Sequence, residues 1–259
     1  MAELSGSTNL PAPPGDRPPG LRRYLATSQN RFPRLVRAWR RRVQRFSLPA
    51  PRFLTKPMAA TIVFVRDVYY DLFRLFVCEP FFKAHCGKIG SHVRTGCFLH
   101  WITGKGIINV GNNVHIDGKS DFAFAARYSD QPVLEIGDNT GIGHACRFVI
   151  GKRVTIGCGC TISGGTIIMD SNGHRADAEA RLQQSAPTDE EVRPVTVGDN
   201  VWIGMHCIIF PGVRIGAGSV ISAGSIVRTH VPPYSVVAGN PARVMFRLKK
   251  PEPPAPQTP

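Results

Sequence analysis

The sequence lacks any pair of cysteines spaced as C-x-x-C, although seven cysteines occur in its 259 residues. That spacing is typical of zinc knuckles and of redox-active cysteine pairs, so neither kind of site is expected. Cys160 and Cys207 occupy small inward positions of the repeat described below, and we interpret both as core residues. An odd number of cysteines without a pairing pattern favours a reducing compartment, and we expect a cytoplasmic location.

Acidic residues are also scarce, since 18 Asp and Glu stand against 32 Lys and Arg and the formal net charge is +14. Residues 1–57 hold twelve basic residues and only two acids, Glu3 and Asp16, which gives 12 − 2 = +10. We interpret 1–57 as a basic, Pro/Arg-rich arm, partly disordered and with one amphipathic helix. Its first twenty residues lack an apolar core, so disorder is expected there. They also lack the apolar stretch of a secretory signal.

The helix of this arm is expected from residue 32 to 46, where apolar residues recur at helical spacing and arginines fill the other faces. One interpretation is attachment to an anionic membrane surface, peripheral to the inner face of the membrane. The others are a solvated helix that packs on the protein itself, and a stretch that precedes the true start of the protein. No nucleic-acid partner is expected, because no nucleic-acid-binding module accompanies the charges.

The sequence has no apolar run that is free of charge over the length of a membrane span. The most apolar stretch, residues 59–82, is interrupted by Arg66, Asp67, Asp71 and Arg74 in a narrow polar stripe. We expect residues 58–85 to form a helical cap over the open end of the fold, because exposed sheet ends need cover. Membrane contact through the apolar face is the alternative.

What the sequence does have is a period of six. The residues in step are Ile136, Ile142 and Phe148, then after a two-residue slip Ile150, Ile156, Ile162 and Ile168, and finally Val197, Ile203, Ile209, Ile215, Ile221 and Val227. Neither an amphipathic helix nor an alternating strand has this period. It predicts a mainly β fold, a parallel β-helix in which each hexad forms one short strand with its aliphatic residue in the core. A Gly-rich β-sandwich with irregular strands is the alternative.

Four segments resemble the hexapeptide-repeat acyltransferases, and most closely their galactoside, maltose, nodulation-factor and exopolysaccharide O-acetyltransferases. They are SNGH at 171–174, TVGDNVWIG at 196–204, ISAGSIV at 221–227 and VAGNPARV at 237–244. The resemblance implies a left-handed β-helix, which departs from the usual right-handed crossover, and assembly as a homotrimer. It places the acyltransferase domain at 86–248, with a loop at 170–195 and a disordered Pro-rich tail at 249–259.

His174 is the predicted general base, and acetyl-CoA is the acyl donor that the resemblance implies. A thioester is already activated, so transfer to a hydroxyl needs a positioned base rather than a covalent nucleophile. His174 lies in a polar break of the repeat and matches the histidine of the family's G-H element, although Arg175 replaces the proline that usually follows. Asp170, Asp177 and Glu179 are candidates to orient its ring. The alternative is an exposed loop histidine without a role.

The resemblance assigns the acyl-CoA site to Trp202, Met205, Ala223, Arg228 and Arg243. An outward tryptophan usually covers a ligand or a neighbouring subunit. A guanidinium suits a CoA phosphate, although a rim salt bridge is the alternative for Arg243.

His144 lies near the place where relatives present an asparagine to the acceptor. It either contacts the acceptor or is a solvated coil residue.

The resemblance implies acyl-CoA-dependent O-acyltransfer, in particular O-acetylation of a carbohydrate hydroxyl, in polysaccharide or glycolipid biosynthesis. A serine O-acetyltransferase-like activity and N-acylation of an amino sugar stay open. A zinc hydrase of this fold would need two histidines five residues apart, which do not occur, so no metal is expected. A non-catalytic scaffold is least favoured, because it would need neither His174 nor the acyl-CoA residues.

Overall fold

The computed structural model describes residues 20–125, 128–186 and 188–251, so most of the expected disordered start and tail lie outside the described residues. The chain divides into two compact units, Met1–Thr61 and Ile62–Pro259. The first contains the helices α1 (Leu21–Thr27) and α2 (Arg31–Arg45), and α3 (Arg52–Phe73) begins within it. The sequence predicted α2 to within one residue at each end, whereas α1 was not expected.

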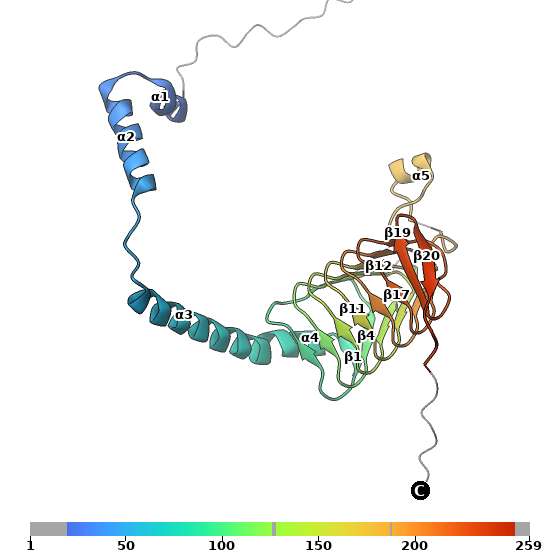
Figure 1. The fold of residues 1–259 in the computed structure, drawn as a ribbon. Coiled ribbons are helices and arrows are strands. Elements are labelled where there is room, and N and C mark those ends of the chain that lie inside the picture. The colour runs from blue at the N-terminus through green and yellow to red at the C-terminus, as the bar shows by residue number, and fades with distance from the viewer. Residues whose placement is uncertain (1–19, 126–127, 187, 252–259) are drawn as a thin grey trace, which may run out of the picture. The chain divides into compact units, whose positions relative to one another are not determined.

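The second unit is a solenoid of three sheets, and its turns are seen stacked in Figure 1. The first face consists of β1 (Cys86–Ile89), β4 (Ile107–Val110), β7 (Val133–Ile136), β10 (Arg153–Ile156), β13 (Val195–Val197) and β16 (Arg214–Ile215). The second consists of β2 (Arg94–Thr95), β5 (His115–Ile116), β8 (Gly141–Ile142), β11 (Thr161–Ile162), β14 (Trp202–Ile203), β17 (Val220–Ile221), β19 (Ser235–Gly239) and β20 (Ala242–Arg247). The third consists of β3 (Trp101–Thr103), β6 (Asp121–Phe124), β9 (Arg147–Ile150), β12 (Ile167–Met169), β15 (Ile208–Ile209) and β18 (Ile226–Val227).

Neighbouring strands of each face pair in parallel, except that β19 and β20 form an antiparallel pair at the end of the second face. The chain visits the first, second and third faces in turn, so each coil adds one strand to every sheet. The fold is therefore a mainly β, left-handed parallel β-helix; the hexads predicted the parallel β-helix, and the family resemblance implied its hand.

The core contains the in-step residues of the repeat. All thirteen, from Ile136 to Val227, are at most 3% exposed. The two-residue slip is explained by β9, a four-residue strand in which both Phe148 and Ile150 point inward. Cys160 and Cys207 are buried in the same core, and burial raises the pKa of both thiols. Their interpretation as core residues is thus confirmed.

The expected cap needs correction. The large apolar residues of α3 between Ile62 and Leu72 are 41% to 69% exposed, so this apolar face is not buried on the solenoid, although the Tyr70 ring of the same helix lies 5.7 Å from that of Phe98. The chain continues through a π-helical turn, Arg74–Cys78, into α4 (Glu79–Ala84), where Cys78, Glu79 and Phe82 are buried. The buried part of the cap is therefore α4 with the end of the π-helical turn before it, and the Phe82 ring reaches the core, where it lies 6.0 Å from that of Phe122. Among the described helices, none combines the length and apolarity that crossing a membrane requires.

His100 lies under this cap, 3% exposed, with its ring 5.1 Å from Phe82 and 5.5 Å from Phe122. Within the described part of the chain, neither ring nitrogen has a hydrogen-bond partner. Burial lowers the pKa of His100 from 6.5 to about 4, because an imidazolium here would lose its hydration. The folded protein therefore holds this histidine neutral over a range in which the unfolded chain binds a proton.

We expect this difference to make folding sensitive to mild acid. As pH falls from about 6.5 towards 4, the free energy of unfolding should drop by on the order of 3 kcal/mol through His100 and should then level off. His100→Leu should remove this part of the pH dependence, as measured by urea unfolding at a series of pH values. The matched control is His92→Asn, because His92 is exposed and asparagine tolerates its positive φ. Equal slopes for wild type and His100→Leu would contradict the assignment.

Candidate functional site

His174 lies in the loop that leaves the solenoid after β12 and returns at β13, at the corner between the third and first faces. Its side chain is exposed. The turn before it is fixed locally, because Gly173 has φ +77 and donates its backbone N–H to Ser171 Oγ at 3.1 Å. Further along, α5 (Ala178–Leu182) stands off the solenoid (Figure 1). The loop therefore presents the predicted base to solvent from a rigid scaffold.

Asp170 anchors this loop to the preceding coil. Its fully buried carboxylate accepts hydrogen bonds from the backbone N–H groups of Gly151, Lys152 and Arg153 at 2.6 to 2.8 Å. Burial raises the pKa of Asp170, and these backbone bonds oppose the shift. The carboxylate is thus already engaged by the preceding coil, and the choice among the three candidates to orient His174 stays open. Asp177 is also engaged, since it caps α5 by accepting from the Ala180 N–H at 2.7 Å.

Trp202 begins β14 on the second face, and its side chain is 54% exposed, so the predicted outward direction is found. Its indole N–H donates to Ser163 Oγ on the preceding coil at 3.3 Å. Ser163 was not among the residues predicted from the sequence. Aligning the hexads could have found it, because Thr161 is the register partner of Trp202 and Ser163 lies two residues further on.

Met205 and Ala223 are exposed at the corner between the second and third faces, on successive coils. These coils stack closely here. A Cβ on Gly204 would lie 2.6 Å from the Ala223 backbone nitrogen, and the Gly224 N–H donates to the Met205 carbonyl at 2.8 Å. The side chains of Met205 and Ala223 are therefore exposed at a corner where hydrogen bonds between coils hold the backbone in place.

His144 is exposed at the same corner, two coils before Met205. A Cβ on Gly164, in the coil between them, would lie 3.0 Å from His144 Cε1, so the imidazole covers this glycine. His144, Met205 and Ala223 thus share one edge of the solenoid, with Trp202 beside it.

The two arginines assigned to CoA lie elsewhere. Arg228 follows β18 at the corner between the third and first faces, and its guanidinium lies 4.3 Å from the centre of the Phe210 ring. Arg243 is exposed on β20, and its Nη1 donates to the Ala242 carbonyl at 3.1 Å. Among the described residues it forms no salt bridge. Its charge therefore has no carboxylate partner within the described chain.

The structure divides the predicted residues between two edges of the solenoid. His174 and Arg228 lie at the edge between the third and first faces. His144, Met205 and Ala223 lie at the edge between the second and third faces, with Trp202 next to it, and Arg243 lies on the last strand of the second face. The strands of the third face separate the two edges, so one chain does not bring His174 beside Trp202. No group of three or more metal-ligating side chains occurs in the part of the chain that the structure describes.

Comparison with known proteins gives matches over the repeat. Residues 194–228 match the family model "Hexapeptide repeat of succinyl-transferase". Galactoside O-acetyltransferase of Escherichia coli is 35% identical over 149 residues, which are 57% of this chain and 61% of that protein. The Saccharomyces cerevisiae protein named "Putative acetyltransferase YJL218W" is 42% identical over 115 residues, or 44% of this chain and 56% of that protein. The chain thus spans less than two thirds of the length of either relative.

Solved structures share the fold. AntD, an N-acyltransferase from Bacillus cereus, in complex with dTDP and 3-hydroxybutyryl-CoA, superposes with a TM-score of 0.53 at 23% identity, covering 66% of this chain and 88% of AntD. The hexad repeat, the stacked parallel coils and the similarity in sequence all indicate the same fold. The chain is similar to hexapeptide-repeat acetyltransferases in sequence over part of its length and shares their fold.

Proposed function

We propose that this protein is an acetyl-CoA-dependent O-acetyltransferase that acts on a carbohydrate hydroxyl. The observation that carries the proposal is the exposed His174, held on an anchored loop of a chain that is similar over 57% of its length to galactoside O-acetyltransferase. His174 is the single histidine in the sequence of the loop between β12 and β13. A general base needs this access to the proton that it removes.

The proposed reaction is a direct transfer. His174 accepts the proton of the acceptor hydroxyl while the hydroxyl oxygen attacks the thioester carbonyl carbon. The C–S bond then breaks, the acetyl group stays on the acceptor oxygen, and His174 returns the proton to the departing CoA sulfur. Trp202, Met205 and Ala223 would line the pantetheine arm. Arg243 would bind a CoA phosphate, because its guanidinium has no carboxylate partner among the described residues. Arg228 would contact the nucleotide end of CoA, and His144 would contact the acceptor.

The separation of the two edges supports assembly as a homotrimer. His174 lies on one edge and Trp202 next to the other, so a site that needs both is completed by a neighbouring copy. In a closed ring, each copy would offer its histidine edge to the tryptophan edge of the next.

All seven cysteines are free thiols in the structure; six of them are buried or partly buried, and Cys158 is exposed. We infer a reducing, cytoplasmic compartment, as for most proteins that keep this many unpaired cysteines. There the enzyme would act on a precursor in polysaccharide or glycolipid biosynthesis.

The experiment that tests this function combines the purified full-length protein with acetyl-CoA and measures thiol release. The acceptors would be a galactoside, an oligosaccharide mixture, an amino sugar and serine. We expect acceptor-dependent release of CoA with the sugars, and mass spectrometry of the product should place the acetyl group on an oxygen. Acetylation of the amino-sugar nitrogen alone would favour N-acylation. Turnover with serine alone would favour the serine acetyltransferase activity.

A further inference from the structure

Helix α2 has an apolar face that no part of its own unit covers. We call it the apolar stripe, and it consists of Phe32, Leu35, Trp39, Val43 and Phe46. The four members within α2 follow one another at spacings of three and four residues, which places them on one side of the helix, and Phe46 follows at its C-cap. Each is between 52% and 71% exposed. Leaving this much apolar surface in water is unfavourable, so the stripe is expected to have a binding partner.

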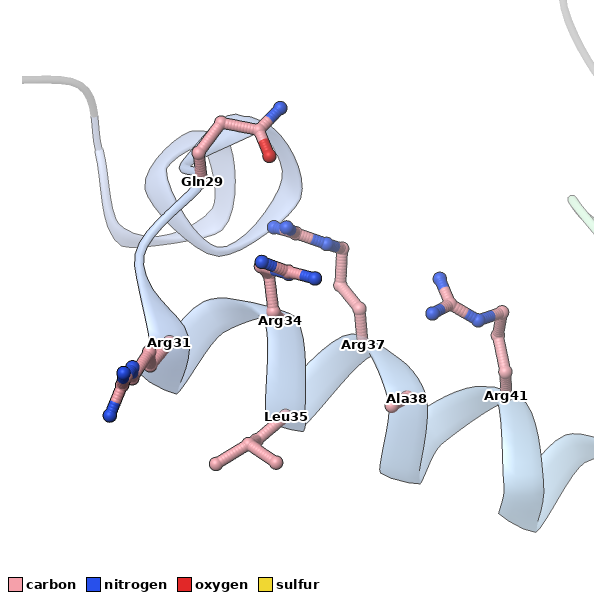
Figure 2. Close-up of a pocket in the computed structure, with 7 residues that line it drawn as sticks. All are labelled: Gln29, Arg31, Arg34, Leu35, Arg37, Ala38 and Arg41. Atoms are coloured by element: carbon pink, nitrogen blue, oxygen red, sulfur yellow. The ribbon is translucent and has the colours of Figure 1, made fainter.

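The stripe is not the packing surface of the helical pair. Helix α1 folds back on a different side of α2, where Pro33 is buried. There Arg37 donates from Nη1 to the Leu25 carbonyl at 2.6 Å and from Nη2 to the Ser28 carbonyl at 2.7 Å. Figure 2 shows Leu35 pointing away from Arg34, Arg37 and Arg41. The unit therefore forms its own contacts and still leaves the stripe free.

The charge around the stripe is positive throughout. No acidic residue occurs between Asp16 and Asp67, while α2 contains seven arginines, at positions 31, 34, 37, 40, 41, 42 and 45. Four of them, Arg31, Arg34, Arg37 and Arg41, line a surface hollow of about 520 Å³ (Figure 2). None forms a salt bridge within the described chain. A partner for α2 must therefore supply negative charge as well as an apolar layer.

We propose that α2 binds the surface of an anionic phospholipid bilayer. The helix lies parallel to the surface, with the apolar stripe at the boundary of the acyl chains. Arg40 and Arg42 lie on either side of the stripe, next to Trp39 and Val43 in sequence, at the height of the lipid phosphates. Nucleic acid would satisfy the arginines but would leave the stripe exposed to water. The proposal is independent of the acetyl transfer, because α2 contains none of the residues assigned to that reaction.

The test measures flotation of the full-length protein with phosphatidylcholine vesicles, with and without phosphatidylglycerol. We expect binding to the anionic vesicles that weakens as salt is raised. Leu35→Ser combined with Trp39→Ser should weaken binding by roughly tenfold or more, because two inserted side chains are lost. Leu182→Ser is the matched control, because Leu182 is exposed on α5 and should not affect binding.

The charge is tested separately. Changing Arg40, Arg41 and Arg42 to Gln should weaken binding roughly 100-fold, whereas changing all three to Lys should leave it within a few-fold of wild type. Brominated lipids should quench the fluorescence of Trp39, and this quenching should be absent in Trp39→Leu, which keeps the stripe apolar and should still float. Equal binding to neutral vesicles would overturn the proposal. So would binding to single-stranded DNA without binding to anionic vesicles.

Discussion

Replacing His174 with alanine is expected to reduce the turnover of acetyl transfer by about 10²–10⁴-fold, the contribution of a positioned general base. His174 is exposed, so the substitution removes no core packing and the melting temperature should change little. The affinity for CoA should also change little, because Trp202, Met205 and Ala223 lie at or beside the other edge of the solenoid. The measurement is initial-rate kinetics with saturating acetyl-CoA, together with CoA binding by calorimetry.

The matched control for this variant is His115→Ala. His115 is also an exposed histidine, but it lies on β5, outside the loop that carries His174, and its ring contacts the Asp117 carboxylate. It should keep wild-type turnover. If the His174 variant keeps more than about a tenth of the wild-type rate, the loss is smaller than a general base explains and the assignment is wrong. His144 would then be the next residue to test.

The repeat could be predicted from the sequence because it is local and periodic. Ile203 and Ile221 are register partners in neighbouring coils, and 221 − 203 = 18, so three hexads form one turn of the solenoid. Counting hexads therefore assigns each in-step residue to a face. The same count places Met205 and Ala223 at one corner and the loop after Ile168 at another.

The contacts that build the site could not be predicted in the same way. Asp170 accepts hydrogen bonds from N–H groups that lie 17 to 19 residues earlier in the chain, on the preceding coil. In the sequence it is an acidic residue at the start of a polar loop, so nothing nearby indicates that its carboxylate is buried. The limits of the cap were missed for a related reason. The apolar pattern of α3 continues into α4 without a break, and only packing of Phe82 against Phe122 distinguishes the buried part from the exposed one.

A second large effect is expected from mixing two inactive variants. Ala223→Trp should fill the corner beside Met205 and block the acyl-CoA arm, while His174→Ala removes the base. Each variant alone should be nearly inactive. In a ring of three copies that contains both variants, one interface always joins an intact histidine edge to an intact Ala223 edge. Mixed trimers should therefore recover about one third of the wild-type activity.

This recovery follows from the division of the site between edges, since a site within one chain would stay inactive in every mixture. The measurement co-expresses the two variants with different affinity tags, purifies the doubly tagged trimers and assays them with acetyl-CoA. The control is a pair of differently tagged His174→Ala chains, which contains no intact base and should recover nothing. A doubly tagged sample without activity would place His174 and the acyl-CoA residues in a single-chain site. A protein that sediments as an active monomer would exclude the shared site altogether.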